Sequence, residues 1–126
     1  MFRWITGNAE VAMVTFNEGN LTLNQNARAY FENSHYVLVG ISDDLKLGIK
    51  PVSKRDVELN IYAKEDLHKI SLGKGYAKIN NKLLLDLISK TIVIKLNGQK
   101  LAGRYDSEEG LLVLDLSQIT NEGGLQ

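Results

Sequence analysis

The sequence contains no cysteine and only one proline, Pro51, among its 126 residues. The absence of cysteine excludes a disulfide framework, a zinc ribbon and a cysteine nucleophile, and it fits the reducing cytoplasm, where we expect the protein to act. No apolar run approaches the roughly 18–20 residues of a membrane span, so we expect no membrane association. With 44% hydrophobic residues and so little proline, residues 1–126 are expected to fold as a single ordered domain.

The formal net charge of zero conceals a segregation of charge along the chain. Residues 1–44 carry two basic and five acidic side chains, whereas residues 45–104 carry thirteen basic and five acidic ones. Residues 105–126 carry five acidic side chains and no basic one. The middle segment is therefore basic by +8, and a local positive field of this kind attracts phosphate groups even on a neutral protein.

The most specific feature is an ungapped internal repeat with a spacing of 56 residues, which relates Gly19–Leu45 to Gly75–Leu101. Each copy has the pattern of a strand, an N-cap, a short helix, a strand, a turn and a strand. Units of this size cannot bury their own apolar faces, so both should share one core. We predict an α+β fold in which two pseudo-symmetric β-α-β-β units, residues 9–52 and 57–116, share this core. Residues 117–126 are predicted to form a flexible tail.

Local signals place the elements of the two units. Asn24 and Asn80 are predicted N-caps for helices that follow them, because asparagine side chains accept hydrogen bonds from free backbone amides. Asn97-Gly98 is predicted to form a type I′ hairpin turn. Residues 53–56 are predicted to link the two units. The pattern predicts strands over residues 9–16, 21–23, 36–41, 45–52, 57–62, 77–79, 91–96, 99–105 and 111–116.

The helical spacing predicts which apolar side chains face the core. Ala27, Tyr30 and Phe31 are expected to face inward from the first helix, and Leu83, Leu84 and Leu87 from the second. The full set of expected core residues is Phe31, Val37, Val39, Leu47, Ile49, Leu83, Leu87, Val93, Leu101 and Val113.

The sequence offers little support for catalysis. His35 and His68 have no partner at metal-ligand or triad spacing, and the acidic pairs Asp43-Asp44 and Glu108-Glu109 fall in predicted turns. We therefore expect a protein that is not an enzyme, with no metal site and no cofactor.

The first repeat resembles a known family of DNA-binding regulators. The segment Gly19-Asn20-Leu21-Thr22-Leu23-Asn24-Gln25-Asn26-Ala27-Arg28, followed by Leu47-Gly48-Ile49-Lys50-Pro51-Val52, resembles the AbrB/MraZ-like swapped-hairpin family, in which two such units interlock into a barrel. The second half also resembles small uncharacterised bacterial or mobile-element proteins, which imply no function. The family resemblance implies that the two units interlock into one small β-barrel with short external helices. It also implies a non-enzymatic, transcription-regulator-like protein that binds double-stranded DNA through basic side chains. The residues expected to contact DNA are Arg28, Lys46, Lys50, Lys54, Arg55, Lys74, Lys78 and Lys82.

A second function remains open on the residues themselves. The family usually has arginine directly after the leading glycine, in the loop that meets DNA, but this chain has Asn20 and Tyr76 there. The missing arginines favour a protein-interaction or structural module, with a protein partner or a homo-oligomer, that keeps the scaffold without binding nucleic acid. The basic middle segment favours DNA. The two alternatives differ in whether the lysines of residues 45–104 share one face of the folded protein.

Overall fold

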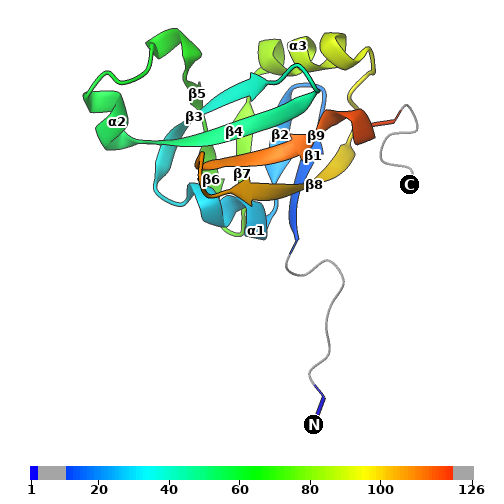
Figure 1. Cartoon of the computed structure of the whole chain (residues 1–126), viewed down its shortest axis with the longest axis horizontal. Coiled ribbons are helices and arrows are strands. Elements are labelled where there is room, and N and C mark those ends of the chain that lie inside the picture. The colour runs from blue at the N-terminus through cyan, green and yellow to red at the C-terminus, as the bar shows by residue number, and fades with distance from the viewer. Residues whose placement is uncertain (3–10, 121–126) are drawn as a thin grey trace.

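The structure is a computed structural model that describes residues 1–2 and 11–120. Its antiparallel strands form one sheet that curls into a nearly closed barrel with a few short helices, as Figure 1 shows. This architecture confirms the predicted barrel with short helices. In sheet order the strands are β5 (His68–Lys69), β3 (Ser34–Ile41), β4 (Lys46–Ser53), β9 (Leu111–Asp115), β8 (Gln99–Asp106), β1 (Ala12–Phe16), β2 (Asn20–Leu23), β7 (Tyr76–Asn80) and β6 (Ser71–Gly73).

The longest helix is α3 (Lys82–Ile92), which lies beside one end of the β3–β4 hairpin in Figure 1. The other helical segments are short, and each is too short to be stable without tertiary contacts. They are α1 (Gln25–Arg28), η1 (Ala29–Phe31), α2 (Lys54–Glu58), η2 (Lys64–Asp66) and η3 (Leu116–Gln118).

The core fills the interior of the barrel, because alternate residues of each strand point inward. In β1, Ala12, Val14 and Phe16 are buried while the residues between them are partly exposed. Phe31 is fully buried, as predicted, and so are the predicted core residues Val37, Leu47 and Ile49, while Leu101 is nearly so. Tyr30 is an exception to the predicted inward face, because its ring is partly exposed and stacks on Tyr105 of β8 at 4.3 Å between centroids.

The barrel is closed at one point because its two edge strands follow each other in the chain. The edge strands β5 and β6 are consecutive in sequence and are separated only by Ile70, whose side chain is buried. The Ile70 N–H donates to the His35 carbonyl at 3.3 Å, and β5 pairs with β3 only at Tyr36 and Val37. We call this junction, residues 68–73, the seam of the barrel. Beyond Val37 the seam no longer covers the edge of β3.

The pseudo-symmetric repeat is not confirmed. The shift of 56 residues does superimpose β2 on β7 in sequence, and a helix follows each of them within two residues. The correspondence then fails, because residues 34–41 form strand β3 whereas residues 90–97 form the last turn of α3 and a loop. The second helix continues because Leu84, Leu85 and Ile88 keep helical spacing and bury one continuous face.

The prediction placed both the start and the buried face of the second helix one residue too early. Asn81, not Asn80, is the N-cap of α3, and its side chain accepts from the Leu84 N–H at 3.1 Å. The buried face consists of Leu84, Leu85 and Ile88, so Leu83 and Leu87 point to solvent. In the first unit the predicted cap is confirmed, since Asn24 Oδ1 accepts from the Ala27 N–H at 3.0 Å.

Three other predictions of local structure are wrong. Residues 53–58 are not a linker followed by a strand, because Ser53 caps α2 by accepting from the Asp56 N–H and the helix follows β4 directly. Residues 91–96 are not a strand, because the helix runs to Ile92. Asn97-Gly98 is not a hairpin turn: only Gly98 has positive φ, and the buried Gln99 side chain bonds the loop at the Asn97 N–H and the Lys95 carbonyl.

Three further residues of the expected core, Val39, Val93 and Val113, are not fully buried. Leu112 and Leu114 of β9 are buried, so the predicted core residue Val113 lies on the outer face, and Val93 is exposed after α3. Val39 is only partly buried.

Of the predicted tail 117–126, Ile119 is buried against the core. Residues 121–126 of this tail, and residues 9–10 of the first predicted strand, lie outside the described residues.

The revised face of α3 predicts opposite outcomes for two neighbouring substitutions. Ile88→Ala should reduce the free energy of unfolding by about 2–5 kcal/mol, because it leaves a cavity in the core. Leu87→Ala should change it by less than about 1 kcal/mol, because Leu87 is 59% exposed. Urea unfolding followed by circular dichroism measures both values. Equal destabilisation by the two substitutions would contradict this orientation of the helix.

Candidate interaction sites on the barrel surface

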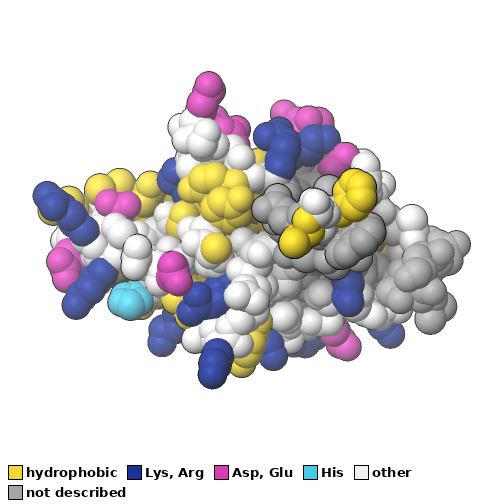
Figure 2. Space-filling view, turned by 90° about the horizontal axis from the view of Figure 1, so that it is seen from below, with side chains coloured by type: hydrophobic (Ala, Val, Ile, Leu, Met, Phe, Trp, Pro, Cys, Tyr) yellow, Lys and Arg dark blue, Asp and Glu magenta, His cyan; other side chains and the backbone are white. Residues whose placement is uncertain are grey.

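The eight predicted DNA-contacting residues do not form one surface. Lys46 and Lys50 lie on β4, whereas Lys78 lies on β7, and strands β9, β8, β1 and β2 separate these two in the sheet order. Lys54 and Arg55 are exposed on α2, at the far end of β4. On the face shown in Figure 2, Lys and Arg side chains are spread out and interleaved with acidic ones. The charge segregation seen in the sequence is therefore largely dispersed by the fold.

Three of the predicted contact residues, Arg28, Lys46 and Lys82, have acidic partners close in sequence or space. Arg28 Nε donates to the Gly73 carbonyl at 2.8 Å and its guanidinium lies 3.5 Å from Glu32, so it ties α1 to β6. Lys82 Nζ lies 3.7 Å from carboxylate oxygens of both Glu18 and Asp86. These pairs reduce the charge that each side chain presents to a phosphate.

Lys46 and Lys50 lie on the outer face of β4, in a shallow hollow of mixed charge of about 570 Å³. Lys46 Nζ is 3.4 Å from Asp115, and Lys50 Nζ donates to the Glu109 carbonyl at 2.7 Å. The pKa of Asp115 is lowered, mainly by the hydroxyl of Ser117, and further by the Ser117 backbone N–H and by Lys46. The pKa of Asp44, at the rim of the same hollow, is lowered mainly by its hydrogen bond from Ser42. The hollow therefore has no excess of positive charge from these two lysines.

Two others of the predicted residues, Lys78 and Lys74, lie on or beside the outer face of strands β8, β1, β2 and β7. The pairing register aligns Lys100, Thr15, Thr22 and Lys78 in one row across these strands, and all four side chains point outward. The exposed Lys74 follows in the β6–β7 turn. A hollow of about 490 Å³ on this face is lined by Thr15, Thr22 and Lys100, with Tyr76 beside them. We call this surface the polar face.

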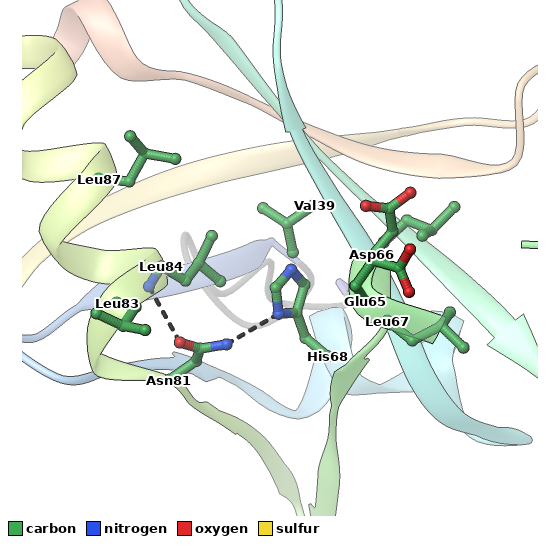
Figure 3. A pocket seen from close by; sticks show the side chains of 10 residues that line it. Val39, Glu65, Asp66, Leu67, His68, Asn81, Leu83, Leu84 and Leu87 are labelled. Carbon is green, nitrogen blue, oxygen red and sulfur yellow. Dashed lines mark hydrogen bonds between the residues drawn. The ribbon is translucent and has the colours of Figure 1, made fainter. Parts of the chain in front are cut away.

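A second candidate surface lies between strand β3 and helix α3. Two hollows of about 640 and 500 Å³ share Val39 of β3 and Leu84 and Leu87 of α3, so they form one continuous groove, which we call the β3–α3 groove. Figure 3 shows the part of it that ends at the seam, with the leucines of α3 on one side and Val39, His68 and residues 65–67 on the other. The exposed Leu83 also lines this part.

A hydrogen bond between the seam and α3 closes the floor of the groove. Asn81 Oδ1 accepts from the Leu84 N–H, so its amide group is left to donate to His68 Nδ1 at 2.9 Å (Figure 3). This contact places the ring proton of His68 on Nε2. The Asn81 N–H in turn donates to the Gly19 carbonyl at 3.1 Å. Asn81 thus joins β5, the β1–β2 turn and α3 at one point, a role that the sequence alone did not indicate.

The edge of β3 that faces the groove has free backbone groups. The Ser42 N–H donates to the Lys46 carbonyl, and the direction of the backbone N–H and C=O groups alternates along a strand. The backbone groups of Leu38 and Gly40 therefore point toward β4, and those of Val39 and Ile41 point away from it. Strand β5 covers β3 only at Tyr36 and Val37. Within residues 1–2 and 11–120, no backbone partner lies on the outer side of Val39 or Ile41.

The groove was not predicted from the sequence, because its apolar residues follow the same pattern as core residues. Leu83, Leu84 and Leu87 fit one helical face, but the true face is shifted by one position along the run of leucines. The run Leu83-Leu84-Leu85 is compatible with either face, so periodicity alone did not distinguish buried from exposed leucines. The N-cap residue was the signal that could have corrected the predicted start of the helix, because a helix capped by Asn81 begins one residue later than a helix capped by Asn80.

Among the residues that the structure describes, no group of three or more His, Cys, Asp or Glu side chains is arranged to hold a metal ion. No helix in the described ranges combines the length and the hydropathy needed to cross a bilayer. No protein-family model, curated protein or solved structure matches the chain. The resemblance to AbrB/MraZ-like proteins therefore stays a prediction.

Asn81 and Asn80 form a matched pair for testing the geometry of the groove. Asn81→Ala removes the cap of α3 and the donor to His68, so it should reduce the free energy of unfolding by about 1–2 kcal/mol. Asn80→Ala should change it by less than about 0.5 kcal/mol, because Asn80 is exposed at the end of β7. Thermal and urea unfolding of both variants measure the difference. A cost for Asn80→Ala as large as that for Asn81→Ala would contradict the assigned cap.

Proposed function

We propose that this protein is a non-enzymatic protein-interaction module whose docking site is the β3–α3 groove. The observation that carries the proposal is the joint presence of exposed leucines and a free strand edge in one hollow. Leu83 and Leu87 are 81% and 59% exposed, although they stand one turn apart on a helix whose other face is buried. Contiguous exposed apolar side chains beside a hollow are typical of binding surfaces.

The groove supports protein binding better than nucleic-acid binding. The described residues that line its two hollows include the carboxylates Glu65, Asp66 and Asp43 and no lysine or arginine. A surface of this charge repels phosphate. Most of the lysines predicted to bind DNA lie elsewhere and on different faces, and this dispersal supports the second of the two functions that the sequence left open. The cytoplasm remains the expected location.

A peptide-display experiment tests the proposed function with a matched control. Random decapeptides are selected on the wild-type protein, and the enriched peptides are titrated against Leu87→Asp and Leu59→Asp. Leu59 is 58% exposed on the segment after α2 and does not line the groove. We expect Leu87→Asp to weaken binding at least about tenfold, since a charge replaces an apolar contact, and Leu59→Asp to leave it unchanged. The proposal fails if no peptide is enriched, or if both variants bind as the wild type does.

A second candidate function is nucleic-acid binding at the polar face. The observation that favours it is the row that carries Lys78 and Lys100 across the polar face, with Lys74 in the adjoining β6–β7 turn. Among the described residues, none of these three lysines has an acidic partner within 4.0 Å. The exposed Tyr76 ring and the hydroxyls of the face would add stacking and hydrogen bonds to a phosphate backbone. Of the eight residues predicted to contact DNA, only Lys74 and Lys78 belong to this site.

Salt-dependent titration with duplex DNA tests this second candidate. If the polar face binds DNA, replacing Lys74, Lys78 and Lys100 with alanine should flatten the log–log salt dependence by roughly 3 units, at about 0.9 per phosphate contact. The control replaces Lys54, Lys64 and Lys90, which are exposed outside the polar face and change the net charge equally. Fluorescence anisotropy at low salt measures both. Equal losses in the two triple variants, or no binding by the wild type at micromolar concentration, would exclude a specific role for this face.

A further inference from the structure

The free edge of β3 indicates how a partner would be held, and this step rests on the proposed function of the groove. We infer that the groove takes an extended peptide as an added strand, paired antiparallel or parallel with Leu38–Ile41. The peptide would have alternating apolar side chains flanked by lysine or arginine. Strand addition of this kind combines backbone hydrogen bonds, which supply affinity, with side-chain pockets, which supply specificity.

The backbone geometry supplies the hydrogen-bonding groups. Val39 and Ile41 direct their N–H and C=O groups away from β4, into the space beyond the end of β5. An open sheet edge normally attracts another strand unless the protein blocks it. In native proteins charged side chains, prolines or bulges commonly block such edges, but residues 38–41 are Leu-Val-Gly-Ile. The only irregularity of β3 lies between Ser34 and Tyr36, outside this stretch.

The side chains around the edge provide apolar walls on both sides. Leu87 lines both hollows, Leu83 extends the wall toward the seam, and Leu45 extends it toward the β3–β4 turn. Leu45 has a φ of 61°, a left-handed conformation that a leucine rarely adopts, and its side chain packs against the core at the end of the groove. A strand lying on the edge of β3 would place alternate side chains against the leucines of α3.

The charge around the groove selects the partner. Glu65 and Asp66 lie at the seam end, and Asp43 lies at the turn end, so acidic groups stand at both ends of the free edge. Basic residues on both flanks of a peptide would complement them. A second copy of this chain fits less well, because antiparallel pairing of two β3 edges would bring Asp43 of each copy near Glu65 and Asp66 of the other. Such pairing would be opposed by like charges.

Amide hydrogen exchange measured by NMR tests the inference with a defined probe. The probe is the peptide Lys-Lys-Val-Thr-Val-Thr-Val-Lys-Lys with blocked ends, and its control carries glutamate in place of all four lysines. Saturation with the probe should slow exchange of the Val39 and Ile41 amides at least about tenfold, because they gain hydrogen-bond partners. The Leu38 and Gly40 amides should not change, because they already face β4. The glutamate peptide should bind at least about tenfold more weakly.

Two N-methylated probes locate the paired edge of the peptide. One carries N-methyl groups on the three valines and the other on the two threonines, so each removes the N–H donors of one edge. One of them should lose at least about tenfold in affinity while the other retains it. Equal binding by both would overturn strand addition.

The remaining outcomes separate this inference from the proposed function. Display peptides that are sensitive to Leu87→Asp, without protection of Val39 and Ile41, would overturn strand addition and leave the interaction module standing. Failure of both the probe and the display would overturn both. Slow exchange of these two amides in the free monomer would mean that a segment of this chain already pairs with the edge, and would overturn strand addition by a peptide. Slow exchange that depends on concentration, with a dimer in sedimentation, would assign it to a second copy.

Discussion

The closure of the sheet at the seam is the constraint on which the rest of the structure depends. A sheet that curls on itself buries its apolar face inside a barrel, and the barrel closes where its two edges meet. Here the join is made by consecutive edge strands, β5 and β6, around the buried Ile70. Because β5 has only two residues, the join covers half of the β3 edge. The other half is left beside α3, and the groove follows from this mismatch in length.

Asn81 explains why helix α3 lies where the barrel is open. Its side chain accepts from the Leu84 N–H, which caps the helix, and donates to His68, the first residue of β5, so one side chain ties the start of α3 to the seam. From that start, helical spacing sends Leu84 and Ile88 into the barrel and leaves Leu87 outside. The same amide thus closes the core and positions the exposed leucines. A change in the cap would alter both stability and the groove.

The distribution of charge illustrates the difference between order in sequence and order in space. The basic excess of residues 45–104 is strong in the sequence, but these residues span both sides of the barrel and most of its helices. Lys46 and Lys82 meet carboxylates from other segments, whereas Lys78 and Lys100 share one row across the polar face without such partners among the described residues. Since fields depend on distance, the surface potential cannot be derived from segment charges without the fold.

The sequence by itself determined most of the strands, the cap at Asn24 and the burial of Phe31, because these depend on residue periodicity and on local hydrogen bonding. The barrel with short helices agrees with the family resemblance, although the repeat on which the resemblance was based does not recur in the fold. Only the tertiary structure decided which face of α3 is buried, because the run Leu83-Leu84-Leu85 satisfies either face. It also decided that residues 54–58 are helical, where the Ser53 cap prevails over an alternating pattern. The groove depends on which strands become edges and how much of each is covered, and these long-range pairings leave no signal in local sequence.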